Sequence, residues 1–174
     1  REKKFEFIEE DVAGLLEDTL TLLERHPSFN GKYRIERQYS VRQALVRVDR
    51  DRIKQVFWNL CDNALRAMPG GGTLTVSLEA EPLLVRIRFR DTGKGFDTCT
   101  AAKLFEPFQS NFPGGTGLGL TITKRLVEMQ GGNINISSKV SEGTSITVSI
   151  PYRIGSAKDL QKTETEIVIN GMLK

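Results

Sequence analysis

The sequence predicts an α+β fold, a two-layer α/β sandwich in which helices cover one face of a mixed, mostly antiparallel sheet. Three observations support this prediction. Helix-like and strand-like segments interleave along the chain, and the strand-like segments alternate apolar with polar residues, as expected when one sheet face is solvated. Short turns join neighbouring strand candidates, which favours hairpins over a doubly wound parallel sheet.

The first half of the chain is predicted to contain two helices and two short strands. Apolar residues near helical spacing over 11–25 predict a helix whose buried stripe contains Val12, Leu15, Leu16, Leu22 and Leu23. Residues 33–39 and 44–48 are strand candidates. Residues 50–68 are the strongest helix prediction, because Asp49 can cap the N-terminus and one apolar stripe contains Ile53, Val56, Phe57, Leu60 and Ala64.

The second half is predicted to contain two hairpins separated by a glycine-rich region and a helix. Alternating apolar residues and turn residues define the hairpins, and Gly131-Gly132 stops the helix. The predicted elements are strands at 73–79 and 83–90, a short helix near 99–105, a helix at 117–130, and strands at 133–138 and 144–150.

Composition excludes several classes of function. The 174 residues carry 25 basic and 22 acidic side chains, a net charge of +3, which is not the concentrated basic stripe of a nucleic-acid-binding protein. One histidine and two cysteines without a CxxC spacing cannot form a Cys/His zinc site. No apolar run approaches the roughly 18 residues that span a bilayer, so we expect no membrane contact by these residues, whether the parent protein is soluble or membrane-anchored. Unpaired cysteines favour a reducing, cytoplasmic setting.

Two asparagines lie inside the strongest predicted helix. Asn59 and Asn63 are four positions apart, so they share one side of the helix at the edge of its apolar stripe. Asparagine is a mediocre helix former, so this pair needs a reason. It is either a pair of ordinary hydrogen-bonded amides or a pair of neutral oxygen ligands suited to Mg²⁺ that also binds substrate phosphates.

Two glycine-rich motifs follow in the second half. Asp91-Thr92-Gly93-Lys94-Gly95 comes directly after a predicted strand, where the glycines allow a sharp turn and the carboxylate can accept hydrogen bonds. The run from Gly114 to Leu120 precedes a predicted helix, whose N-terminus and nearby N–H groups suit an anion. Taken alone, the first is a common turn and the second is equally compatible with a flexible loop.

The order of these motifs is more specific than any one of them. Asn-x-x-x-Asn, Asp-x-Gly-x-Gly, the run Leu104-Phe105-Glu106-Pro107-Phe108, and Gly-Thr-Gly-Leu-Gly-Leu follow one another at suitable intervals. Together they resemble the N box, first glycine box, F box and second glycine box of the ATP-binding catalytic domain of bacterial two-component sensor histidine kinases. These kinases belong to the Bergerat-fold ATPases, and the resemblance covers residues 8–151.

The resemblance implies a role for each matching residue, with ATP and Mg²⁺ as the ligands. Asp91 would accept a hydrogen bond from the adenine amino group, and Thr144 would assist adenine binding through a water molecule. Asn63, with Asn59 beside it, would coordinate Mg²⁺, and these two are the expected catalytic residues. Arg66 would approach a phosphate. The remaining nucleotide-binding residues would be Gly93, Gly95, Phe96, Thr116, Gly117, Leu118, Gly119 and Leu120.

Position 59 separates the members of this superfamily. Gyrases, mismatch-repair ATPases, heat-shock chaperones and anti-sigma-factor kinases usually carry a glutamate there, which can act as a general base. Asparagine cannot take a proton, which fits transfer to an already nucleophilic imidazole. The alternatives are a Bergerat-fold ATPase or protein serine kinase, and a degenerate nucleotide-binding interaction module.

The run Asn63–Pro69 and the short ATP lid at 96–115 look most like the nitrogen-regulation branch of sensor kinases. Phe105 and Phe108 would form the apolar latch of this lid. That branch often has Thr-Thr-Lys after its F box, whereas Gln109-Ser110-Asn111 follow here. The missing lysine removes one expected phosphate contact.

The resemblance also implies a domain organisation and partners. Residues 1–7 would be a linker from an absent dimerisation helix, 8–151 the ATP-binding domain, and 152–174 a tail of unknown role. The one histidine, His26, precedes Pro27 at a predicted helix end, unlike the family's acceptor histidine. We therefore expect the acceptor on a separate dimerisation domain of the parent kinase, and a response regulator as the indirect partner.

Overall fold

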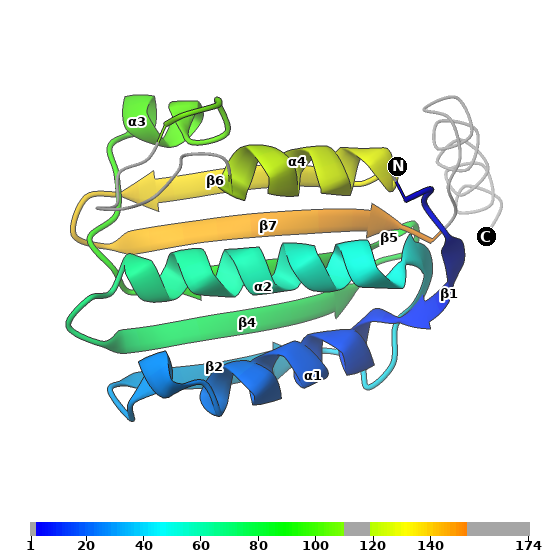
Figure 1. Ribbon diagram of the computed structural model, residues 1–174, viewed down its shortest axis with the longest axis horizontal. Coiled ribbons are helices and arrows are strands. Elements are labelled where there is room, and N and C mark those ends of the chain that lie inside the picture. The colour runs from blue at the N-terminus through cyan, green and yellow to red at the C-terminus, as the bar shows by residue number, and fades with distance from the viewer. Residues whose placement is uncertain (1–2, 110–118, 153–174) are drawn as a thin grey trace, which may run out of the picture.

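A computed structural model describes residues 3–109 and 119–152. Its main sheet has five strands in the order β2-β4-β5-β7-β6, and helices α1, α2 and α4 lie over one face of it (Figure 1). This is the predicted two-layer α+β architecture. The helices are α1 (Val12–Glu24), α2 (Arg50–Arg66), α3 (Thr98–Lys103) and α4 (Gly119–Met129). The strands are β1 (Phe7–Asp11), β2 (Tyr33–Tyr39), β3 (Leu45–Asp49), β4 (Gly72–Ala80), β5 (Leu84–Asp91), β6 (Asn133–Lys139) and β7 (Gly143–Pro151).

The pairing of the strands confirms a mixed, mostly antiparallel sheet. β2 runs parallel to β4, whereas the pairs β4–β5, β5–β7 and β6–β7 are antiparallel. Along β5, buried Val85, Ile87 and Phe89 alternate with more exposed arginines, so the arginines lie on the face without helices. The core therefore lies between the sheet and the helices, where the rings of Phe57 on α2 and Phe89 are 6.0 Å apart.

The two helices predicted in the first half of the chain form, and an aspartate caps each of them. The side chain of Asp49 accepts a hydrogen bond from the N–H of Arg52, and that of Asp11 accepts one from Ala13. One residue of the predicted α1 stripe is wrong, since Leu22 is 61% exposed. Leu23 lies at the centre of the buried face of α1. Successive helical residues are rotated by about 100° around the helix axis, so the side chain of Leu22 points away from that face.

The N-terminal strand β1 was not predicted. Its sequence, Phe-Ile-Glu-Glu-Asp, is too acidic to stand out as a strand. It pairs antiparallel with β3, which forms close to its predicted position but outside the main sheet. Residue Glu6, in the expected linker, donates its N–H to the Asp49 carboxylate at 2.9 Å. The entry to the domain is therefore attached to the start of α2.

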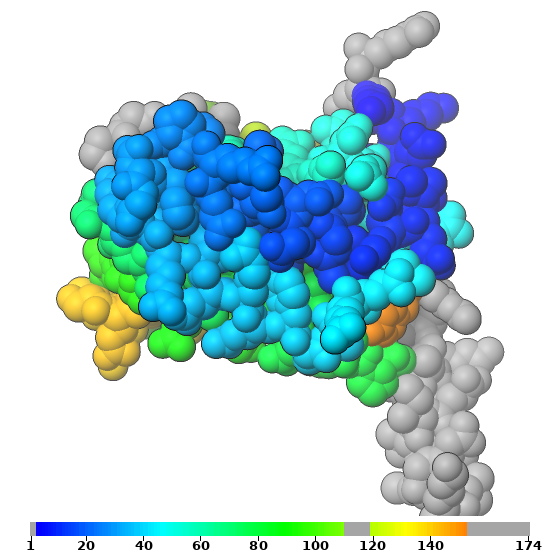
Figure 2. Space-filling model, turned by 90° about the horizontal axis from the view of Figure 1, so that it is seen from below, coloured from blue at the N-terminus to red at the C-terminus, as the bar shows by residue number. Residues whose placement is uncertain are grey.

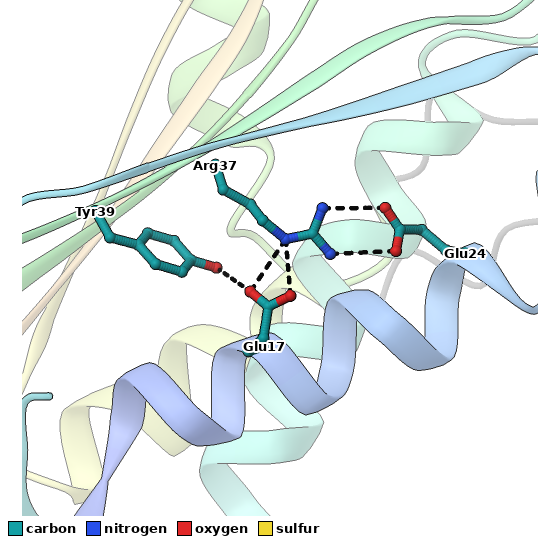
Figure 3. Close-up of polar contacts among 4 residues, drawn as sticks. All are labelled: Glu17, Glu24, Arg37 and Tyr39. Carbon is teal, nitrogen blue, oxygen red and sulfur yellow. Dashed lines mark hydrogen bonds and ion pairs between the residues drawn. The ribbon is translucent and has the colours of Figure 1, made fainter. Parts of the chain in front are cut away.

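A charged cluster holds α1 against β2 at one edge of the sheet, where these two elements lie side by side (Figure 2). Arg37 on β2 donates to Glu17 at 2.8 Å and to Glu24 at 3.0 Å, both on α1 (Figure 3). The Tyr39 hydroxyl donates to Glu17 at 3.1 Å. Burial, and then the Glu17 carboxylate, raise the pKa of Tyr39 well above its ordinary value. These contacts attach α1 to the edge strand β2 of the sheet.

Within residues 3–109 and 119–152, none of the helices has the length and apolar character needed to cross a membrane.

Candidate functional site

A cavity lies between α2 and the ends of β5 and β7. Its volume is about 30 Å³, enough for a few water molecules. Most of its lining is apolar, and the polar side chains Asn63, Asp91 and Thr144 face it from different elements. The full lining is Leu60, Asn63, Ala64, Ala67, Phe89, Asp91, Phe96, Leu104, Leu120, Ile136, Thr144 and Ile146. The sheet and the helices thus bring together residues that lie far apart in the sequence.

Asp91 is the buried carboxylate of this cavity, with 5% of the residue exposed. Its Oδ1 atom accepts hydrogen bonds from the N–H groups of Gly93 at 2.8 Å and Thr144 at 3.3 Å. Burial raises the pKa of the Asp91 carboxyl above its ordinary value, and the two backbone hydrogen bonds oppose that rise. Two donors on one oxygen fix the orientation of the carboxylate.

Ser138 on β6 supports this arrangement and was not predicted. Its hydroxyl donates to the carbonyl of Gly143 at 3.1 Å, so it must accept in its other bonds. It accepts from the Thr144 hydroxyl at 2.7 Å and from the N–H of Phe96 at 2.8 Å. One serine therefore links Thr144 to the loop that follows Asp91. The sequence offered no signal for it, because serine on the outer part of a hairpin is ordinary.

The glycines after Asp91 are required by close approaches of the backbone. A Cβ atom on Gly93 would collide with the carbonyl oxygen of Ala67. Gly95 has φ +62°, and a Cβ there would also meet the carbonyl oxygen of Lys139. The first glycine motif is thus a loop packed between the end of α2 and the β6–β7 hairpin.

The two asparagines share one side of α2, as predicted, but differ in their surroundings. Asn63 lines the cavity opposite Asp91. Asn59, one turn earlier, donates from Nδ2 to the hydroxyl of Thr123 on α4 at 3.2 Å. Both are half-buried. Among the described residues, no cluster of three His, Cys, Asp or Glu side chains could hold a metal. A pair of neutral amide oxygens fits Mg²⁺ that takes its other ligands from phosphate and water.

Arg66 is not in the cavity lining. It forms an i, i+4 ion pair with Asp62 at 2.9 Å, and both side chains are about half exposed. Of the second glycine box, Thr116, Gly117 and Leu118 lie outside the described residues. Gly119 is exposed at the start of α4, and Leu120 lines the cavity.

The described part of the expected lid has a small core of its own. Phe96, Ala101 and Leu104 are buried together, with Leu120 and Ile136 packed against them. The two latch residues behave differently. Phe105 packs against the main core, whereas Phe108 is 78% exposed.

Several lining residues were missed, although periodicity could have found them. Phe89 precedes Asp91 by two residues and Ile146 follows Thr144 by two, so each shares a strand face with its polar neighbour. Ala67 follows Asn63 by one helical turn. A small residue at 67 leaves room for the close approach of Gly93.

Comparison with known proteins fits this geometry. Residues 48–154 match the family described as histidine kinase-, DNA gyrase B-, and HSP90-like ATPase. The chain belongs to this family. Among curated members, it is 42% identical over 118 residues to sporulation kinase D of Bacillus subtilis (strain 168), which covers 67% of this chain and 23% of that protein. The matched region is the catalytic ATP-binding domain of sensor histidine kinases.

Solved structures of histidine kinases have the same fold as this domain. The nucleotide-free catalytic domain of histidine kinase ThkA superposes with a TM-score of 0.77 at 28% identity, covering 85% of this chain and 97% of that one. Full-length ShkA in complex with AMPPNP gives a TM-score of 0.77 at 25% identity, covering 90% of this chain and 33% of that one. The chain spans 23% of the length of sporulation kinases D and A.

Proposed function

We propose that this domain binds ATP with Mg²⁺ in the cavity between Asp91 and Asn63 and donates the γ-phosphoryl group to a histidine on a separate dimerisation domain. The observation that carries the proposal is the buried Asp91 carboxylate, oriented by two backbone N–H groups at the end of an apolar cavity. An apolar slot with one fixed acceptor suits a purine that presents an amino group. Thr144, beside the carboxylate, would assist through water.

One wall of the cavity can move more readily than the others. Phe96 and Leu104 line it from the expected lid, and they belong to a core of only three buried residues. Displacing this small core costs less than displacing α2 or the sheet, so nucleotide binding moves the lid side of the cavity.

The proposed phosphate end of the site is supported by the sequence motifs and lies beside the start of α4. Asn63, with Asn59 beside it, would supply amide oxygens to Mg²⁺, which neutralises phosphate charge when bound. Arg66 would bind a phosphate by giving up its exposed ion pair with Asp62. Backbone N–H groups at Gly93, Gly95, Thr116–Gly119 and Leu120 complete the proposed nucleotide contacts.

Transfer is favoured over hydrolysis by the chemistry of the lining. Among the described residues that line the cavity, Asp91 is the one carboxylate, and its Oδ1 is committed to backbone donors. Asn59 cannot act as a general base. The domain would therefore work by positioning and charge neutralisation, and an imidazole would be the nucleophile.

The wider setting belongs to the same proposal. It includes the acceptor domain of the parent kinase, a response regulator downstream and a cytoplasmic location. Relatives named as sporulation and sensor histidine kinases support the kinase setting. Assignment to the nitrogen-regulation branch rests on the run Asn63–Pro69 and the short lid.

Calorimetric titration with the Mg²⁺ complexes of ADP and GDP tests the nucleotide assignment. Guanine presents a carbonyl where adenine presents an amino group, so it cannot donate to Asp91. We expect ADP to bind at least tenfold more tightly than GDP, because a hydrogen bond to a charged group contributes about 1.5–3 kcal/mol. Equal affinity for the two nucleotides, or no binding of either, would contradict the proposal.

A further inference from the structure

The hydroxyl of Thr123 is the polar group that connects α4 to the asparagine pair on α2. Thr123 lies one turn into α4 and has no exposed surface. A hydroxyl buried in a core must form hydrogen bonds, because burying it unpaired costs free energy. It has two bonds here, one to the carbonyl of Gly119 at 2.8 Å and one to Asn59 Nδ2 at 3.2 Å.

The number of protons on these groups fixes the direction of both bonds. Thr123 has one hydroxyl proton, and a carbonyl oxygen can only accept, so that proton goes to Gly119. Thr123 Oγ1 must therefore accept from its second partner. Only the NH₂ end of the Asn59 amide can donate to it, which directs the Asn59 Oδ1 atom away from Thr123.

We infer that Thr123 is a positioning residue, which holds the amide of Asn59 so that its oxygen, rather than its NH₂ group, is offered to Mg²⁺. This inference rests on the proposed function of the asparagine pair. It also connects the first turn of α4, where Gly119 accepts, to the metal side of the site. An amide that rotates by 180° presents two donors to a cation, so this single acceptor decides whether Asn59 can be a ligand.

The variant Thr123→Val removes the hydroxyl with little change in volume, and Thr123→Ser restores it. We would measure the dissociation constant of ADP with Mg²⁺ and again with EDTA, and take the ratio as the Mg²⁺ effect. Partners that orient metal ligands typically contribute 10–100-fold to metal affinity. We expect Thr123→Val to reduce the Mg²⁺ effect about tenfold, with less than about threefold change in EDTA, and Thr123→Ser to retain it.

Thr19 on α1 provides a matched control. It is buried in a helix and donates to the carbonyl of Leu15, four residues earlier, at 2.9 Å. Among the described residues, this hydroxyl bonds to no other side chain. Thr19→Val thus removes the same type of backbone bond without affecting an asparagine. We expect a loss of stability similar to that of Thr123→Val and an unchanged Mg²⁺ effect.

The orientation can also be checked without metal or nucleotide. The side-chain NH₂ resonance of Asn59 in a ¹⁵N–¹H spectrum should shift in Thr123→Val and stay in place in Thr19→Val. An unchanged resonance, or equal weakening of ADP binding with and without Mg²⁺, overturns the inference and leaves the proposed function standing. A wild-type chain that binds ADP equally in Mg²⁺ and EDTA instead overturns the magnesium part of the proposed function, and the inference with it.

Discussion

The Asp91 carboxylate on β5 accepts a hydrogen bond of 3.3 Å from the backbone N–H of Thr144 on β7, although the two residues lie 53 positions apart in the chain. The sheet register sets this contact, because Arg90, the neighbour of Asp91, pairs with Ser145. The position of the carboxylate is therefore set by the sheet together with the N–H of Gly93 in the loop that follows it. Both contacts go to one oxygen and need an acceptor rather than a charge, so the charge can be tested separately from the fold.

Replacing Asp91 with asparagine should weaken ADP binding without unfolding the domain. Asparagine keeps an oxygen for the N–H groups of Gly93 and Thr144, but loses the charge that the nucleotide amino group would meet. We expect affinity to fall about 10–100-fold, and the free energy of unfolding at neutral pH to stay within about 1 kcal/mol or rise. Calorimetry and urea unfolding measure the two quantities. Asp51→Asn, which alters an exposed carboxylate on α2 paired with Lys3, is the control. It should leave ADP affinity unchanged and lower stability only slightly, because a solvent-exposed ion pair contributes little.

The raised pKa of Asp91 predicts a pH dependence with a definite sign. The folded state holds this proton more tightly than the unfolded state. The stability contributed by Asp91 therefore falls as pH rises from about 3.9, the ordinary aspartate pKa, through the raised value. Nucleotide affinity should change in the opposite sense, since only the ionised carboxylate accepts well. As the pH is lowered from neutral, the affinity for ADP should fall in the wild type and stay constant in Asp91→Asn. The same pH dependence in both proteins would refute the role of the Asp91 carboxylate in binding the nucleotide.

Gly93→Ala should distort the loop that follows Asp91. The added Cβ would meet the backbone carbonyl oxygen of Ala67, which cannot rotate away like a side chain. We expect a loss of about 1–3 kcal/mol of stability, typical of overpacking, together with weaker ADP binding. Gly70→Ala is a matched control, because its Cβ would meet nothing within 4 Å. If both variants behave alike, close packing does not explain the glycine at 93.

Removing Arg37 should destabilise the domain without affecting nucleotide binding. The Arg37 side chain is 28% exposed and lies between Glu17 and Glu24, so its loss leaves two carboxylates facing each other. Both glutamates are partly solvated, so we expect Arg37→Ala to cost only about 1 kcal/mol. Arg34 on the same strand pairs with Glu36 at the surface and is 76% exposed. Arg34→Ala should therefore change stability by less than about 0.5 kcal/mol in the same thermal unfolding experiment.

Local signals in the sequence were enough for most of the fold. The apolar stripe of α2 and its cap at Asp49 located that helix, and alternation located the strands on either side of each hairpin. The ordered motifs pointed to Asn63 and Asp91, and the family resemblance added Thr144; the structure brings all three to the lining of one cavity. These features are encoded over a few residues, or in the order of several short motifs.

Features set by distant contacts could not be predicted in this way. β1 is a strand because β3 is available to pair with it, and Leu22 is exposed because of where α1 lies on the sheet. Ser138 and Thr123 are ordinary hydroxyl residues until the fold places them beside Thr144 and Asn59. Their roles arise from pairing and packing across the molecule, which no local pattern records.

Transfer of labelled phosphate to a histidine is the decisive measurement of the proposed kinase activity. The chain would be incubated with γ-labelled ATP, Mg²⁺ and a helical hairpin that carries an acceptor histidine, with a hairpin in which alanine replaces that histidine as control. We predict label on the histidine hairpin that is stable in alkali and lost in acid, as expected for phosphohistidine, and none on the control. Steady release of inorganic phosphate without labelling of the hairpin would contradict the account and indicate a hydrolase.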